Sequence, residues 1–241
     1  MRLFLYALSL LTLLLLQGCS TSEPVRVSEA NPAALDNTHW QHLILPSKKQ
    51  THYSFGQQRG RDAIHARSTA SASMLRKDLH IASADLDVVK FSWHVPELIR
   101  DADLAKRDFD DSPVRIVLIF DGDKSKFSAK NAMLSEMAEM LSGEALPYAT
   151  LMYVWCNKRE PGSVVVNPRT DRIRSIVVES GGRNLRQWLD YERNIRADYE
   201  KAFGELPGDL LRVGIMTDSD NTQSQTVASY GAMHFGKQAR K

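Results

Sequence analysis

Residues 114–120 read VRIVLIF, an apolar run that only Arg115 interrupts. A strand with one face in water alternates apolar and polar residues, whereas a strand buried on both faces reads as a continuous apolar run. The sequence therefore predicts that residues 114–120 form a central strand that is covered on both faces.

Shorter strand-like runs, separated by turn residues, lie on both sides of this stretch. They occupy residues 40–45, 63–67, 88–95, 150–156, 163–166, 173–178, 211–216 and 226–235. From residue 89 onward the third of them alternates, as expected for a half-buried strand. Many short strands with turn-rich separators favour a β-sandwich over a parallel α/β sheet.

Two segments show helical spacing instead, at about 128–142 and 185–203. Their apolar residues recur three or four positions apart, and a glycine that can end a helix follows each segment, Gly143 and Gly204 respectively. The predicted fold class is therefore mainly β: a jelly-roll-like β-sandwich with two inserted helices.

Length and charge limit the possible partners. The 241 residues carry 31 basic and 29 acidic side chains, a net charge of +2, which gives no electrostatic footprint for nucleic acid. Residues 39–236 suit one β-sandwich domain. The basic residues 237–241 are interpreted as a solvated tail.

The N-terminus has the layout of a secretory signal over residues 1–18. Arg2 precedes the uncharged apolar run 3–16, and the small residue Gly18 stands directly before Cys19. This arrangement resembles a bacterial lipobox, which implies cleavage before Cys19 and its acylation by chains such as palmitate. The alternatives are an ordinary signal peptide or a membrane helix, although the run is shorter than the ~20 residues that a span needs.

A lipidated Cys19 would place the protein in the cell envelope as a membrane-anchored lipoprotein. Residues 19–38 are rich in Ser, Pro, Asn and Glu and are predicted to be a tether. Ser20 after the cysteine resembles the default outer-membrane address, facing the periplasm. Cys156 would then be the last free thiol, and its apolar neighbours indicate a buried side chain.

Familiar enzyme signatures are absent from the sequence. It contains no G-x-S-x-G, H-E-x-x-H or G-x-G-x-x-G motif, which favours a non-enzymatic role.

Acidic residues at strand ends carry the most suggestive chemistry. Asp218, Asp220 and Asn221 follow one predicted strand, and Asp121 and Asp123 follow another. Oxygen-rich loops of this kind can bind Ca²⁺, the candidate cofactor. Two alternatives stay open, which are turn stabilisation by Asp and Asn side chains and a pair of catalytic carboxylates.

Two tryptophans and an arginine complete the candidate site residues. Trp93 and Trp155 lie in the middle of predicted strands, where one could face solvent and stack on a sugar ring; core packing is the alternative. Arg193 could orient an anionic substrate.

Several segments resemble an uncharacterised bacterial family, domain of unknown function 3047. The resemblance rests on residues 111–123, 151–155, 188–204, 218–222 and 230–231 and covers most of the chain. The D-x-D-N-T segment at 218–222 and the strand pattern also resemble jelly-roll carbohydrate-binding modules. A fold does not fix a function, so this likeness implies only an architecture.

The leading hypothesis is a lipid-anchored domain that binds a glycan or another envelope component without catalysis. One alternative is an envelope hydrolase that uses Asp121 and Asp218, with Arg193 placing the substrate. The other alternative is a scaffold for envelope proteins that docks through an exposed apolar patch near Trp93 or Trp155.

Overall fold

The computed structural model describes residues 39–237. The predicted signal peptide, the tether with Cys19, and residues 238–241 of the basic tail lie outside the described residues. None of the helices in the described part has the length and apolar character required to cross a membrane.

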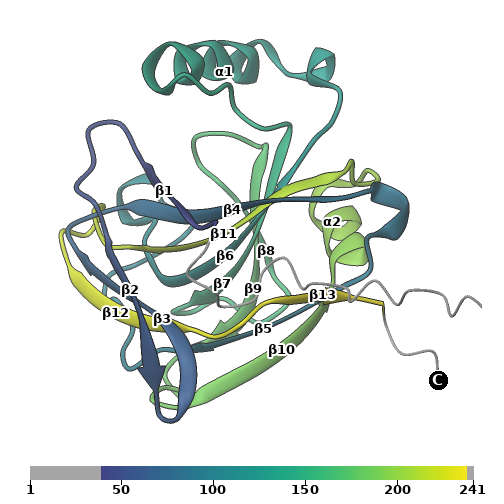
Figure 1. Cartoon of the computed structure of the whole chain (residues 1–241). Helices are drawn as coiled ribbons and strands as arrows, with labels where there is room; N and C mark the ends of the chain where they lie inside the picture. Colours follow the sequence, from purple (N-terminus) through teal and green to yellow (C-terminus); the bar gives the residue numbers. More distant parts are fainter. Residues whose placement is uncertain (1–38, 238–241) are drawn as a thin grey trace, which may run out of the picture. The chain divides into compact units, whose positions relative to one another are not determined.

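Two β-sheets face each other and enclose the main core (Figure 1). The seven-stranded sheet contains, in spatial order, β1 (Gln41–Ile44), β4 (Ser73–Ile81), β11 (Leu210–Asp218), β6 (Ser112–Phe120), β7 (Ala149–Cys156), β9 (Ile173–Ser180) and β8 (Val164–Val166). The six-stranded sheet contains β10 (Trp188–Asn194), β5 (Val88–His94), β12 (Gln225–Tyr230), β3 (Arg61–Thr69) and β2 (His52–Gln58), with β13 (His234–Gly236) paired to β5.

Strand pairing is antiparallel except between β7 and β9. Successive strands cross repeatedly between the sheets, because β3, β5, β10 and β12 belong to one sheet and β4, β6 and β11 to the other. This crossing is the jelly-roll-like arrangement that the sequence predicts, and the fold class is confirmed.

Strand β6 lies in the middle of its sheet, and all nine of its residues are buried. Ile116, Leu118 and Phe120 point into the space between the sheets, whereas Val117 and Ile119 belong to a second apolar cluster on the outer face. The prediction of a central strand covered on both faces is confirmed.

Helix α1 (Ala129–Ser142) agrees with the predicted segment 128–142. The Ser128 side chain accepts a hydrogen bond from the backbone N–H of Asn131, and Gly143 ends the helix with φ of 76°. Such a left-handed position suits glycine, which lacks a Cβ. Figure 1 places α1 on the outer side of the seven-stranded sheet.

The second helix is shorter than the predicted segment 185–203. Residues Trp188–Asn194 form strand β10, and α2 (Ile195–Phe203) begins only after Asn194, whose side chain accepts a hydrogen bond from the N–H of Ala197. Pairing of β10 with β5 along its whole length decides the conformation here, so tertiary context overrides the helical spacing.

Candidate functional site

The predicted acidic residues are at opposite ends of the seven-stranded sheet. Asp218 pairs with Ser112 at the start of β6, and the carboxylates of Asp111, Asp218 and Asp220 approach within 4.8 Å of one another. Asp121 follows the other end of β6, nine residue steps from Ser112, or about 30 Å along a strand. The predicted catalytic pair of Asp121 and Asp218 is therefore wrong.

Asp123 also lies at this far end and has a local role. Its carboxylate accepts hydrogen bonds from the backbone N–H and the hydroxyl of Ser125, at 3.0 and 2.6 Å, and the side chain is exposed. This is the turn stabilisation that formed the alternative to a metal ligand. Asp121 and Asp123 cannot share a metal ion with Asp218.

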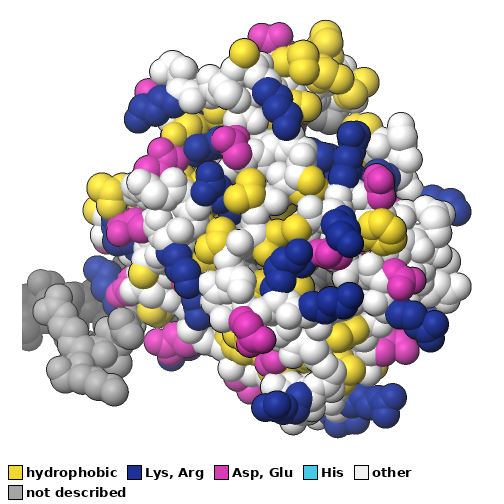
Figure 2. Space-filling view, turned by 180° about the vertical axis from the view of Figure 1, so that it is seen from behind, with side chains coloured by type: hydrophobic (Ala, Val, Ile, Leu, Met, Phe, Trp, Pro, Cys, Tyr) yellow, Lys and Arg dark blue, Asp and Glu magenta, His cyan; other side chains and the backbone are white. Residues whose placement is uncertain are grey.

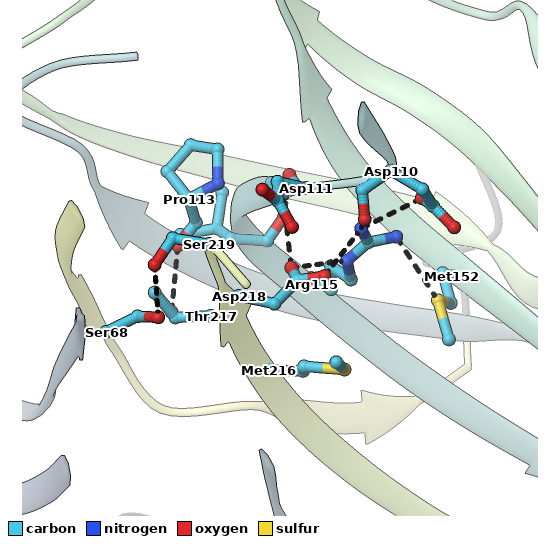
Figure 3. A network of polar contacts seen from close by, with 12 residues as sticks. Ser68, Asp110, Asp111, Pro113, Arg115, Met152, Met216, Thr217, Asp218 and Ser219 are labelled. Carbon is cyan, nitrogen blue, oxygen red and sulfur yellow. Dashed lines mark hydrogen bonds and ion pairs between the residues drawn. The ribbon is translucent and has the colours of Figure 1, made fainter. Parts of the chain in front are cut away.

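Arg115 is the centre of the buried network at the near end of β6 (Figure 3). Its guanidinium donates to both carboxylate oxygens of Asp218, at 2.9 and 3.0 Å, and to Asp110 at 3.1 Å. Burial acts to lower the pKa of Arg115, but the charges of Asp218 and Asp110 outweigh it and raise this pKa. Burial raises the pKa of Asp218 to about 7, against the lowering effect of Arg115.

The other two carboxylates of this cluster also have protein partners. Asp111 accepts hydrogen bonds from the N–H of Asn221 at 3.1 Å and from the N–H and hydroxyl of Thr222 at 2.7 and 2.6 Å, and Asp220 pairs with Lys48. Calcium needs six to eight oxygen ligands, and here it would have to displace an arginine, a lysine or these backbone donors. The residues present fit an ion-pair network and not a calcium cage.

The remaining predicted site residues, Trp93, Trp155 and Arg193, already make contacts within the protein. Trp93 and Trp155 are 0% and 1% exposed, and their rings lie 6.4 Å apart in the core. Neither ring has a face for a sugar, so the stacking prediction is wrong and core packing accounts for both. Arg193 of β10 donates two hydrogen bonds to Asp198 of α2, so its guanidinium is already bound to a carboxylate of the protein.

A polar groove lies on the outer face of the six-stranded sheet, and the sequence analysis did not predict it. Its volume is about 450 Å³, within the range of small-molecule sites. The polar side chains that line it are His52, Ser54, Gln58, His65, Arg67, His94 and Ser229.

Strand register places four of these side chains in one row across the sheet. Ser54 pairs with His65, His65 with Ser229, and Ser229 with His94. Alternate residues of a strand share a face, so all four point away from the core that their neighbours fill. The next residue in the row is Trp188, whose half-buried ring lies 5.9 Å from the His94 ring.

His94 is the unusual member of the row. It is 5% exposed, and its Nε2 is buried without a hydrogen-bond partner in the described structure. An unpaired buried polar atom costs about 1–3 kcal/mol. Burial lowers the pKa of His94, so the imidazole is held neutral, with one donor and one acceptor nitrogen.

The other members of the row are oriented by each other and by the backbone. His65 Nδ1 lies 3.0 Å from the Ser229 hydroxyl, and Trp188 Nε1 donates to the carbonyl of Gln58 at 2.9 Å. At the edge of the sheet the Arg61 guanidinium covers the Trp188 ring at 5.5 Å. These contacts fix the directions of the polar groups before any ligand arrives.

A signal for the groove is present in the sequence. In the segments 63–67, 88–95 and 226–235, the positions opposite the apolar ones hold His65, Arg67, Ser92, His94 and Ser229. Each set of polar positions is also typical of the solvent-exposed face of an ordinary strand. Whether these side chains come together depends on which strands are neighbours and on the register of their pairing. The alternation of residues within one strand does not determine either.

Comparison with known proteins gives a family and a fold. Residues 38–234 match the model of a family described as "Protein of unknown function (DUF3047)". No curated protein matches the chain.

Three solved structures are similar over most of their lengths. "Structure of TmCBM61 in complex with beta-1,4-galactotriose" has a TM-score of 0.34 at 10% identity and covers 83% of this chain and 90% of its own. "Cellulose induced protein, Cip1" has a TM-score of 0.40 at 6% identity and covers 84% and 93%. The xyloglucanase domain of NopAA from Sinorhizobium fredii, in complex with cellobiose, has a TM-score of 0.40 at 8% identity and covers 83% and 93%.

Proposed function

The chain belongs to the DUF3047 family of proteins of unknown function, and from that premise we propose that its β-sandwich binds a glycan in the polar groove without cleaving it. The observation that carries this proposal is the row of outward-facing polar side chains from Ser54 to His94, which lines the groove. Hydroxyl and imidazole groups in such a row favour a ligand that brings its own hydroxyl groups.

The chemistry of the groove suits a neutral, hydroxyl-rich ligand. Its polar groups are hydroxyls, imidazoles and an amide, which can both donate and accept hydrogen bonds, as sugar hydroxyls do. Arg67 is the one residue among its lining that carries a fixed charge. The adjacent Trp188 supplies an aromatic surface at the end of the row.

The same lining argues against glycoside hydrolysis. Most glycosidases need a pair of carboxylic groups about 5–9.5 Å apart. No Asp or Glu is among the residues that line the groove, and Asp121 and Asp218 lie at opposite ends of β6. The groove is therefore proposed as a binding surface.

We place this binding domain in the cell envelope. The lipobox-like segment before Cys19 supports an acyl anchor, and the segment 19–38 supports a tether of ~19 residues between membrane and domain. The ligands within reach would be envelope polysaccharides, with the outer membrane facing the periplasm as the proposed location.

Calorimetric titration of the full chain with polysaccharides isolated from the cell envelope tests the proposal. His94→Ala and Arg67→Ala should each weaken binding about tenfold. Arg67 is exposed, so its replacement leaves folding intact, and His80→Ala on the other sheet is the matched control that should bind normally. A chelator should have no effect, because no acidic residue lines the groove. Absence of binding to every envelope polysaccharide would reject the proposal.

A further inference from the structure

Helix α1 covers the outer face of the seven-stranded sheet without packing tightly against it. Its two buried residues, Asn131 and Ser135, are both polar. Asn131 anchors the helix to the chain beyond β8 by hydrogen bonds to Asp171 at 2.6 Å and Thr170 at 2.8 Å. Four large apolar side chains of α1 are exposed: Met133, Met137, Met140 and Leu141.

Hydrophobic side chains accordingly gather at the top of Figure 2, where α1 lies in Figure 1, while charges of both signs are interspersed over the rest of that face. A helix normally buries its apolar stripe against its own domain. Here only part of the apolar stripe of α1 is buried, and space remains between the helix and the sheet.

Two adjacent cavities of about 600 and 400 Å³ occupy that space. They share a largely apolar lining: Leu45, Met74, Leu146, Met152 and Ile173. From α1, Leu134 lines the larger cavity, and Ala138 and Leu141 line the smaller. The lining is rich in methionine, whose flexible thioether adapts to ligands of irregular shape.

Accessible charge at the mouth of the larger cavity is positive. Lys48 and Arg169 have side chains that are 40% and 41% exposed, and they pair with Asp220 and Asp110, whereas Arg107 is exposed and makes no ion pair among the described residues. The acidic residues of this lining are buried and already paired: Asp110, Asp218 and Asp220. A ligand end at this mouth therefore meets Arg107 as the cation without an acidic partner among the described residues, with the paired Lys48 and Arg169 beside it.

We propose that this space, called the α1 cavity, binds a single-chain amphiphile with an anionic head group. The acyl chain lies between α1 and the methionine-lined sheet, and the head group meets Arg107 and Arg169 at the mouth. An apolar cavity with a few convergent cations matches both ends of such a molecule. The proposal is independent of the glycan groove, which lies on the other sheet.

Photo-crosslinking of the full chain tests this proposal. A diazirine derivative of hexadecanoate, added to the cell fraction that contains the protein, should label peptides with Met74, Met152 or Leu134. Unlabelled hexadecanoate should compete about tenfold better than hexadecanol, which has the same chain without the charge.

Two variants and a control locate the site. Leu134→Glu puts a charge into the cavity from a half-buried helix position, which spares the fold, and should abolish labelling. Arg107→Ala should reduce competition by hexadecanoate about tenfold, whereas the exposed Arg183→Ala, outside the lining, should not. Four results would each overturn the proposal. These are labelling of peptides outside the lining, no labelling at all, equal competition by hexadecanol, and capture of a protein by α1 in place of the lipid.

Discussion

Arg115 carries its charge inside the protein, with a side chain that is 5% exposed. Two carboxylates, Asp218 and Asp110, lie against that charge and accept its hydrogen bonds. A buried ion pair contributes little net stability compared with an apolar replacement of both partners, but removal of one partner leaves the other charge buried and unpaired. The network therefore makes the start of β6 intolerant of single changes.

Arg115→Met tests this role. We expect the free energy of unfolding to fall by about 3–5 kcal/mol, because Asp218 and Asp110 lose their shared cation. Urea denaturation measures the change. Arg61→Ala, which removes the exposed pair with Asp190, is the control and should cost less than about 1 kcal/mol. Equal effects of the two substitutions would contradict the account.

His94 predicts a pH dependence of stability. Burial lowers its pKa below the ordinary value of 6.5, so the unfolded chain takes up a proton before the folded protein does. Stability from this group is complete above pH 6.5 and is lost as the pH falls through the lowered pKa. Between pH 7 and 5.5 the wild type should lose more stability than His94→Gln, by up to about 1.4 kcal/mol per pH unit. Identical pH profiles would show that His94 is not held neutral.

Residue types alone identified two of the three clustered carboxylates, Asp218 and Asp220. The sequence placed Asp218, Asp220 and Asn221 in one loop at the end of a strand. Residues so close in the chain are necessarily close in space. It could not show that Arg115, hidden in an apolar run, neutralises Asp218, because that pairing depends on β11 lying beside β6. For the same reason the sequence missed His65 and His94 as partners of Ser229.

At the scale of elements, the residues that end helices predicted the structure better than the spacing of apolar residues did. Gly143 and Gly204 end the two helices as predicted, with φ of 76° and 71°. The spacing of Trp188 and Tyr191 suggested helix, but both residues also suit a strand, and pairing with β5 selects the strand. Strands β2 and β4 were not predicted, because polar residues interrupt their apolar pattern.

Asn194 marks the boundary between β10 and α2, and its replacement tests that assignment. Asn194→Ala removes the acceptor for the N–H of Ala197 and should lower the free energy of unfolding by about 1 kcal/mol. Asn194→Ser keeps a capping oxygen and should recover most of the loss. Thermal or urea unfolding compares the two, and equal losses would argue against the capping role.

At the scale of the molecule, the two sheets present outer faces of different chemistry. The six-stranded sheet carries hydroxyls and imidazoles in the polar groove, whereas the seven-stranded sheet carries methionines beneath α1. An aromatic core that includes Trp93 and Trp155 lies between the two sheets. The two proposed binding surfaces therefore lie on separate sheets.

The proposed anchor is tested at the same scale. Mass spectrometry of the protein from its native cells should find acyl chains on Cys19 as the first residue, and Cys19→Ser should release the protein from the membrane fraction. Without an acyl chain, no segment in the described residues could hold it there as a membrane-spanning helix. An unmodified thiol at Cys19 would reject the anchor without affecting the groove.

The most direct measurement of the central claim is histidine NMR of the full chain during titration with envelope polysaccharides. If the groove binds a glycan, the imidazole signals of His65 and His94 will shift with ligand concentration, because both lie in the same row of the sheet as Ser229. The signal of His80, on the other sheet, will stay in place. Binding that leaves His65 and His94 unchanged would contradict the account.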